Sequence, residues 1–287
     1  MTAIYKRELK SYLTSMIGYL FIFFVLILTG IYFSAYQLAA AYPKFEYTLS
    51  SLTFVFLIGV PVLSMRVLAE ERKQKTDQLL LTAPVTVADI VIGKYLALVT
   101  VFAVPVLIMC TYPLIMSGFG EISFGAAYTA ILGFFLLGCA NLAIGVFISS
   151  ITESQVIAAV LTFVILFAFF MMNGISSFFS ESSMSTCITF ALLVFAVALI
   201  LYTMIKNFMI SAIVGNVGEI ILIIIYLMKS SFFEGGIQKV LQVFNLSGHF
   251  ENFTNSIFDL TGVVYFLSVI VVCMFLTVQS ISKRRWN

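Results

Sequence analysis

The longest charged stretch of this chain, residues 70–92, lies between two apolar runs. It combines acidic, basic and hydroxyl side chains with a leucine edge and a proline. The candidate binding residues are Glu71, Arg72, Lys75, Thr76, Asp77, Gln78, Leu80 and Pro84. Charges of both signs beside an apolar edge can seat in a groove of a soluble protein, so the stretch predicts a docking element. The alternative is an interfacial loop whose charges only obey the rules of membrane topology.

A second candidate is an acidic residue inside an apolar run. Glu219 lies near the middle of residues 208–228, and Asn216 precedes it by one helical turn. A carboxylate in hydrocarbon costs at least about 2.5 kcal/mol, so Glu219 should face protein or water. It is either a substrate or proton site or a neutral side chain hydrogen-bonded between helices, and the sequence favours neither.

The sequence predicts no catalytic residue and no cofactor or metal bound by this chain. A phosphate-binding loop needs a leading glycine and a Lys-Ser/Thr pair, whereas Gly93-Lys94 is followed by Tyr95. The single histidine, His249, cannot form the usual zinc or nucleophile motifs, and the four cysteines lack paired spacing. Any energy for pumping must therefore come from an ion gradient or from another subunit.

Composition places the chain in a membrane. Hydrophobic residues make up 62% of the 287 positions and charged residues only 10%, against about a quarter charged in soluble domains. The net charge of +2 is too small to suggest a nucleic acid partner. We therefore expect one all-α polytopic domain over 1–287, embedded in lipid.

Apolar run length predicts eight crossings, since roughly 20 residues span a bilayer. Only Lys206-Asn207 separates the sixth run from the seventh, which together form an expected hairpin over 187–228. The expected spans are 17–38, 50–69, 93–117, 124–149, 155–175, 187–205, 208–228 and 262–281.

Basic residues predict the orientation. With the N-terminus inside, only Lys44, Lys229 and Lys239 of the 15 Lys and Arg fall outside. That bias follows the positive-inside rule and predicts a multi-pass plasma-membrane protein with both termini in the cytoplasm.

Two amphipathic segments flank the spans. Near the start, apolar side chains recur at helical spacing with Lys6, Arg7 and Lys10 turned away, which predicts an interfacial helix. The external segment 234–249 carries a second stripe and is expected on the outer surface or as a cap on the bundle. The two stripes are Tyr5, Leu9, Tyr12, Leu13 and Met16, and Ile237, Val240, Leu241 and Phe244.

Local chemistry shapes the charged stretch. Residues 70–82 lack Gly and Pro, so a short helix is expected to reach Thr82 before Pro84 breaks it. The spacing of Thr86 and Asp89 predicts a capping box that starts the next helix.

The same capping-box spacing occurs at Thr152 and Gln155, beside the turn between the fourth and fifth spans. Pro61 and Pro105 are expected to kink the second and third spans.

Four segments together resemble ABC-2 type transporter permeases, most closely the gliding-motility-type (GldF-like) and nitrous-oxide-cluster-type members. They cover the chain except about 181–235. Lys75 stands where the family usually has glycine. The segments are Lys6-Arg7-Glu8-Leu9-Lys10-Ser11-Tyr12, the 70–97 stretch from Glu70-Glu71-Arg72 to Gly93-Lys94-Tyr95-Leu96-Ala97, Ser149-Ser150-Ile151-Thr152-Glu153-Ser154-Gln155, and His249-Phe250-Glu251-Asn252-Phe253 with Asp259 and Tyr265-Phe266-Leu267-Ser268.

The resemblance implies a permease subunit of an ATP-driven exporter in a bacterial plasma membrane. It implies a partner ABC ATPase that binds ATP and Mg and docks on 70–90, and a second permease subunit. Two other classes stay open: an ion-gradient-driven carrier that uses Glu219, and a membrane scaffold or sensor subunit without transport.

Overall fold

The structure is a computed structural model. It describes residues 1–75, 85–180, 182–192, 194, 216–217, 219–220, 222, 224–227 and 233–285. The elements within these ranges are helical, and no strand occurs there, which confirms the predicted all-α membrane fold. The chain forms two compact units, residues 1–170 with 246–287 and residues 171–245, and each is described by itself.

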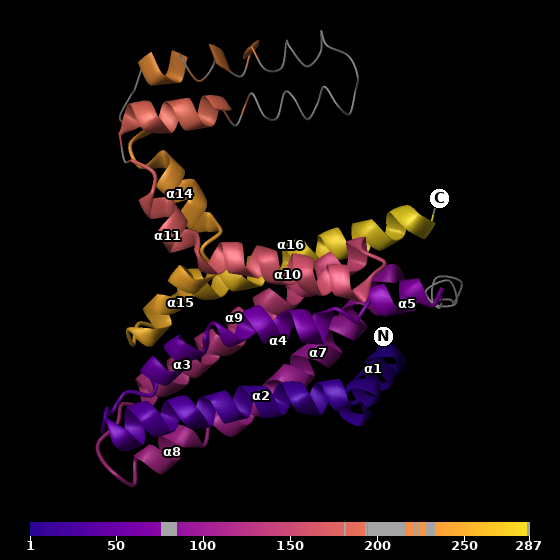
Figure 1. Cartoon of the computed structure of the whole chain (residues 1–287), viewed down its shortest axis with the longest axis vertical. Helices are drawn as coiled ribbons and strands as arrows, with labels where there is room; N and C mark the ends of the chain where they lie inside the picture. The colour runs from indigo at the N-terminus through magenta and orange to yellow at the C-terminus, as the bar shows by residue number, and fades with distance from the viewer. Residues whose placement is uncertain are drawn as a thin grey trace. The chain divides into compact units, whose positions relative to one another are not determined.

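The first unit is a helix bundle (Figure 1). Its helices, in chain order, are α1 Thr2–Thr14, α2 Met16–Phe33, the π-helix η1 Ser34–Ala39, α3 Glu46–Leu52, α4 Val55–Ser64, α5 Ala69–Lys73, α7 Val87–Met109, α8 Tyr112–Met116, α9 Phe124–Ile151, α10 Gln155–Phe170, α15 Leu246–Thr254 and α16 Leu260–Arg285.

Membrane-spanning candidates match five of the eight expected runs. Four helices in the described residues are long and apolar enough: Met16–Ala39, Val87–Met116, Phe124–Ile151 and Leu260–Lys283. A fifth candidate joins Glu46–Leu52 to Val55–Lys73 across a 57° bend.

The expected span 155–175 is shorter than predicted. It appears as α10, which has 16 residues and is about 24 Å long at 1.5 Å per residue. The expected spans 187–205 and 208–228, and so the hairpin 187–228, lie mostly outside the described residues.

Helix α9 is the central element of the first unit. It packs against α4, α7, α10, α15 and α16, and 78% of its most apolar window is buried. A Cβ on Gly138 would lie 2.3 Å from the Phe102 ring, and one on Gly145 would lie 2.4 Å from the Ser64 hydroxyl. These glycines let neighbouring helices approach closely, as small residues do in membrane bundles.

The second span bends at a different place from the one predicted. The break falls at Thr53 and Phe54, before α4, whereas Pro61 lies inside α4. Helix α7 continues through Pro105 from Val87 to Met109. A proline removes one donor, but neighbouring helices can compensate for that loss without a sharp bend.

The second unit contains α11 Met172–Ser177, a helical stretch over residues 183–192 and α14 Gly236–Val243. Asn245 donates to the Asn173 side chain, and Gln238 donates to the Phe179 carbonyl at 2.7 Å. These bonds tie α14 to α11 and the residues after it.

The predicted external stripe of 234–249 is only partly buried. Helix α14 starts after Gly235, which has a φ of +63°. Ile237 is buried, while Val240 and Phe244 are exposed.

Candidate functional site

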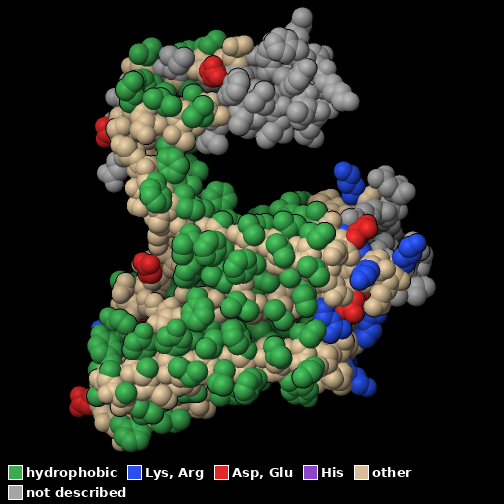
Figure 2. Space-filling view, in the orientation of Figure 1, with side chains coloured by type: hydrophobic (Ala, Val, Ile, Leu, Met, Phe, Trp, Pro, Cys, Tyr) green, Lys and Arg blue, Asp and Glu red, His purple; other side chains and the backbone are tan. Residues whose placement is uncertain are grey.

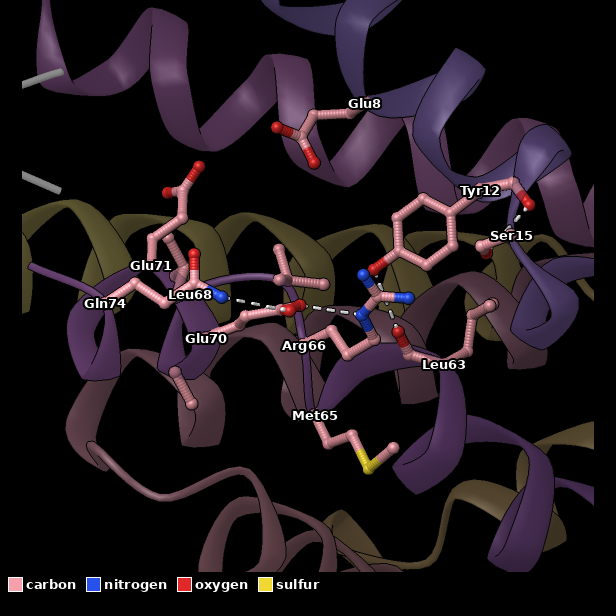
Figure 3. A network of polar contacts seen from close by, with 12 residues as sticks. Glu8, Tyr12, Ser15, Leu63, Met65, Arg66, Leu68, Glu70, Glu71 and Gln74 are labelled. Atoms are coloured by element: carbon pink, nitrogen blue, oxygen red, sulfur yellow. Dashed lines mark hydrogen bonds and ion pairs between the residues drawn. The ribbon is translucent and has the colours of Figure 1, made fainter. Parts of the chain in front are cut away.

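Three other helices hold the short segment that connects α4 to α5. Helix α4 ends at Ser64 and α5 begins at Ala69, so the backbone between them needs outside partners. The Tyr12 hydroxyl of α1 donates to the Leu63 carbonyl at 3.1 Å (Figure 3). The Ser149 hydroxyl of α9 accepts from the amides of Leu68 and Ala69, each at 3.2 Å.

The third support is Lys94, a buried cation on α7. Its side chain is 1% exposed, and it donates to the Val67 carbonyl at 2.9 Å. It also pairs with Glu71 at 2.9 Å and with Glu8 at 3.2 Å. A buried cation is tolerated only when it is paired and hydrogen-bonded, and these three acceptors match the three donors of an ammonium group.

Arg7 closes the network from the surface. Its guanidinium lies 2.6 Å from Glu8 and 2.8 Å from Glu71. Two cations and two carboxylates therefore alternate, and we call Arg7, Glu8, Glu71 and Lys94 the polar cluster. It joins α1 and α7 to α5, the first helix of the charged stretch.

The pKa values of Glu8 and Arg7 are shifted by their contacts in the polar cluster. Burial acts to raise the pKa of Glu8, but the charge of Lys94 and hydrogen bonds from Arg7 and Lys94 outweigh it, so the pKa falls below its usual 4.5. The hydrogen bond to Glu8 likewise raises the pKa of Arg7. The stability that the ion pairs of Glu8 contribute is thus present above about pH 4.5 and is lost as the pH falls and Glu8 protonates.

Further contacts fix α5 to the end of the bundle. Arg66 pairs with Glu70 at 2.7 Å (Figure 3). Arg72 donates to the Thr152 carbonyl at 3.1 Å, next to the C-terminal end of α9. Lys and Arg side chains gather at this end of the first unit, while its flank is largely apolar (Figure 2).

Comparison with known families identifies the chain. A family model described as "ABC-2 family transporter protein" matches residues 31–237, which is well over half of the sequence. The chain belongs to the ABC-2 transporter family. No curated protein matches it.

Family membership makes this chain a membrane-spanning permease subunit of an ABC transporter and a multi-pass membrane protein. The family match includes α5 and Lys94 but begins after α1. In this ABC-2 permease the charged stretch begins in α5 and ends in α7. The polar cluster ties these two helices together.

The charged stretch has a shorter first helix than predicted. Helix α5 ends at Lys73, so the expectation that it reaches Thr82 is wrong. The amide of Lys75 donates to the Arg72 carbonyl, and Lys75 adopts a φ of +57°. This left-handed turn ends the helix, and such a conformation favours glycine.

One of the two expected capping boxes is confirmed. The Asp89 amide donates to the Thr86 hydroxyl at 3.1 Å, and that hydroxyl donates to the Asp89 carboxylate at 2.6 Å. At Thr152 the prediction is wrong. Helix α10 begins at Gln155, and the Thr152 hydroxyl donates back to the Ile148 carbonyl.

The predicted docking residues divide into two groups. Glu71 and Arg72 have partners within the chain, and Lys75 forms the turn after α5. The remaining predicted docking residues lie outside the described residues, and they are Thr76, Asp77, Gln78, Leu80 and Pro84.

Asn216 and Glu219 lie in the second unit, apart in sequence from the polar cluster. Asn216 is exposed and Glu219 is half-buried. Their role as an intramembrane polar site stays a prediction.

Sequence reasoning missed Glu8, Lys94 and Ser149 as structural partners. Lys94 carried a usable signal, because a charge inside an apolar run must find a buried partner. Nothing in the sequence named Glu8 as that partner, since it lies 86 positions away.

Proposed function

We propose that this permease belongs to an exporter whose separate ABC ATPase docks on residues 70–92. A second permease subunit would complete the transport unit, in a bacterial plasma membrane with both termini of this chain in the cytoplasm. ATP and Mg would be bound by the ATPase. Force applied to the docking segment would reach the bundle through α5 and α7.

The proposal rests on the polar cluster, together with the hydrogen bonds that hold the adjacent segment between α4 and α5. A docking segment transmits force only if its ends are fixed to the helices that must move. Glu71, near the start of the docking segment, forms an ion pair at 2.9 Å with Lys94, which follows the end of that segment. Helices α1, α7 and α9 hold the backbone between α4 and α5. A push on the segment is thereby distributed over several helices at once.

The gathering of basic residues supports the cytoplasmic orientation. The same end carries α1, α5 and the C-terminal end of α16, with Lys283 exposed. An excess of Lys and Arg beside the spans is typical of the inner face.

The docking surface can be tested by purification of the tagged chain from its native host. We expect an ABC ATPase to co-purify, to be identified by mass spectrometry and to hydrolyse ATP. The triple variant Lys75→Glu, Asp77→Lys and Leu80→Asp should reduce the co-purified ATPase at least tenfold, because it reverses the charges and removes the apolar edge.

A matched control makes the same chemical changes in the second unit. Glu234→Lys, Lys239→Glu and Val240→Asp alter three exposed residues, and ATPase recovery should stay at the wild-type level. Retention of the ATPase by the first triple variant would refute docking on 70–92. Absence of any ABC ATPase from the wild-type preparation would refute the assembly itself.

Reconstitution separates this proposal from the gradient-driven carrier. Transport by the chain alone under an ion gradient, lost in Glu219→Gln, would favour the carrier. Transport that requires an added ATPase and ATP would favour the exporter. ATPase-driven release of a surface factor without transport would favour the scaffold or sensor role.

A further inference from the structure

A polar pocket lies at the end of the first unit opposite the polar cluster. Its volume is about 270 Å³, and it opens between α3 and the loop after α15. Lys44, Glu46, Tyr47 and Ser50 line one side, and Thr254–Ser256 line the other. Hydroxyl, amide and charged groups thus converge on a space suited to a small polar ligand.

The two charges of this pocket act on each other without forming a direct ion pair. Glu46 is 4% exposed, whereas Lys44 is exposed. Neither forms an ion pair within the part of the chain that the structure describes. The Glu46 carboxylate is hydrogen-bonded to its own backbone and lies near the Lys44 charge. A buried carboxylate is still expensive to charge, and a cationic ligand would stabilise it further.

Hydrogen bonds fix the side of the pocket that contains Lys44 and Glu46. Gln37, on the π-helix η1, accepts from the Thr48 hydroxyl at 2.7 Å and donates to the Lys44 carbonyl at 2.9 Å. These bonds fix the segment from Lys44 to Thr48 against η1. Single π-turns inside helices often occur at functional sites.

The far wall is fixed by a second set of contacts. Asn252 donates to Asp259 at 2.8 Å across the loop, and Ser256 adopts a φ of +65°. Phe253 is fully buried, with its ring 2.6 Å from a Cβ placed on Gly133 of α9. The loop is thus anchored on both sides of the residues that line the pocket.

An aromatic pair borders the site. Tyr42 and Tyr47 pack edge to face with ring centroids 4.7 Å apart, and both are exposed. Tyrosine is enriched where protein meets the lipid headgroups, and its ring face attracts ammonium groups. Both properties suit a ligand with an ammonium group, such as a lipid headgroup at the membrane surface.

We propose that this pocket binds a zwitterionic ligand, with its ammonium group at Glu46 and its anionic group at Lys44. An anion alone would meet the buried Glu46 carboxylate, and a cation alone would meet Lys44, whereas a zwitterion satisfies both. The ligand is the phosphoethanolamine headgroup of a membrane lipid or a soluble molecule with the same pair of charges. The site stands apart from the coupling segment and does not depend on ATPase docking.

Lipid binding to the purified full-length chain tests the site. Native mass spectrometry with phosphatidylethanolamine and phosphatidylglycerol should show at least a tenfold preference for the zwitterionic lipid. Glu46→Gln should abolish that preference, because only phosphatidylethanolamine carries an ammonium group, and Lys44→Gln should weaken the binding of both lipids, because both carry the phosphate. Glu121→Gln, an exposed acid in the loop before α9, should leave it unchanged. Equal binding of the two lipids, or variants that bind like wild type, would contradict a lipid headgroup site.

Soluble probes separate the two sources of the ligand. Thermal shift with O-phosphoethanolamine should exceed the shift with glycerol phosphate or ethanolamine, and the compound should displace the lipid. A shift sensitive to Lys44→Gln without any lipid preference would assign the site to a soluble zwitterion. The proposal fails if neither probe shows a response that depends on these two residues. Lys44 is exposed, so its variant reports on binding even if Glu46→Gln lowers stability.

Discussion

The two ends of the first unit use charge in opposite ways. At the end with α1 and α5, Lys94 is buried and its charge is met by Glu8 and Glu71. At the other end, Lys44 and Glu46 share a pocket without pairing. Ion pairs within the polar cluster hold helices together and can transmit force. Charges that do not pair directly with each other, as in the pocket, can instead bind a ligand. The difference between the ends thus separates a mechanical role from a ligand-binding role.

The largest effect is expected when each of the two lysines, Lys94 and Lys44, is replaced by methionine in a separate variant. Lys94→Met removes the buried cation of the polar cluster and leaves two partly buried carboxylates with only the half-exposed Arg7 between them. We expect a loss of about 3–5 kcal/mol in unfolding free energy. Lys44→Met removes an exposed charge that has no ion pair among the described residues, and it should change stability by less than about 0.5 kcal/mol. Unfolding in mixed micelles measures both.

A compensated variant shows whether the loss comes from unpaired charge. Lys94→Met combined with Glu8→Gln and Glu71→Gln should lose less stability than Lys94→Met alone, because no buried charge remains. If the combined variant is the least stable of the set, the polar cluster is held by packing rather than by ion pairs.

A smaller effect is expected from glycines at the two ends of α2. A Cβ on Gly18 would lie 2.3 Å from the Tyr12 carbonyl oxygen, which is backbone, so Gly18→Ala must displace α1. We expect a cost of about 1–3 kcal/mol from this overpacking and weaker ATPase stimulation, because α1 carries Glu8. Thermal unfolding and ATPase activity of the purified complex measure the two effects.

Gly30 provides the control on the same helix. Apart from its chain neighbours and the nearby backbone of α2, no heavy atom of the described residues lies within 4 Å of a Cβ built at Gly30, so Gly30→Ala should be neutral or slightly stabilising. Full ATPase stimulation in Gly18→Ala would show that the position of α1 does not matter for coupling.

The sequence predicted what depends on local or averaged properties. Hydropathy located the spans of α2, α7, α9 and α16, because each contains an apolar run long enough to cross a bilayer. The Thr86–Asp89 cap was predicted because its two residues lie within one helical turn.

Errors arose where contacts distant in sequence decide the outcome. The bond from Tyr12 to Leu63 spans 51 positions, and that from Ser149 to Leu68 spans 81. Helix propensity over residues 70–82 could not reveal that α5 stops at Lys73, because propensity is a weak guide against tertiary contacts. The pocket with Glu46 likewise depends on α15, which lies about 200 positions later in the sequence.

The smallest expected effect concerns left-handed residues at the two ends. Lys75 has a φ of +57° and Ala41 a φ of +52°, and both conformations strain a side chain with a Cβ. Lys75→Gly and Ala41→Gly should each raise the unfolding free energy by up to about 1 kcal/mol. Only Lys75→Gly removes a predicted docking charge, so it alone should lower ATPase affinity, measured by titration of the ATPase. Equal affinity in both variants would mean that Lys75 serves the turn after α5 and makes no contribution to docking.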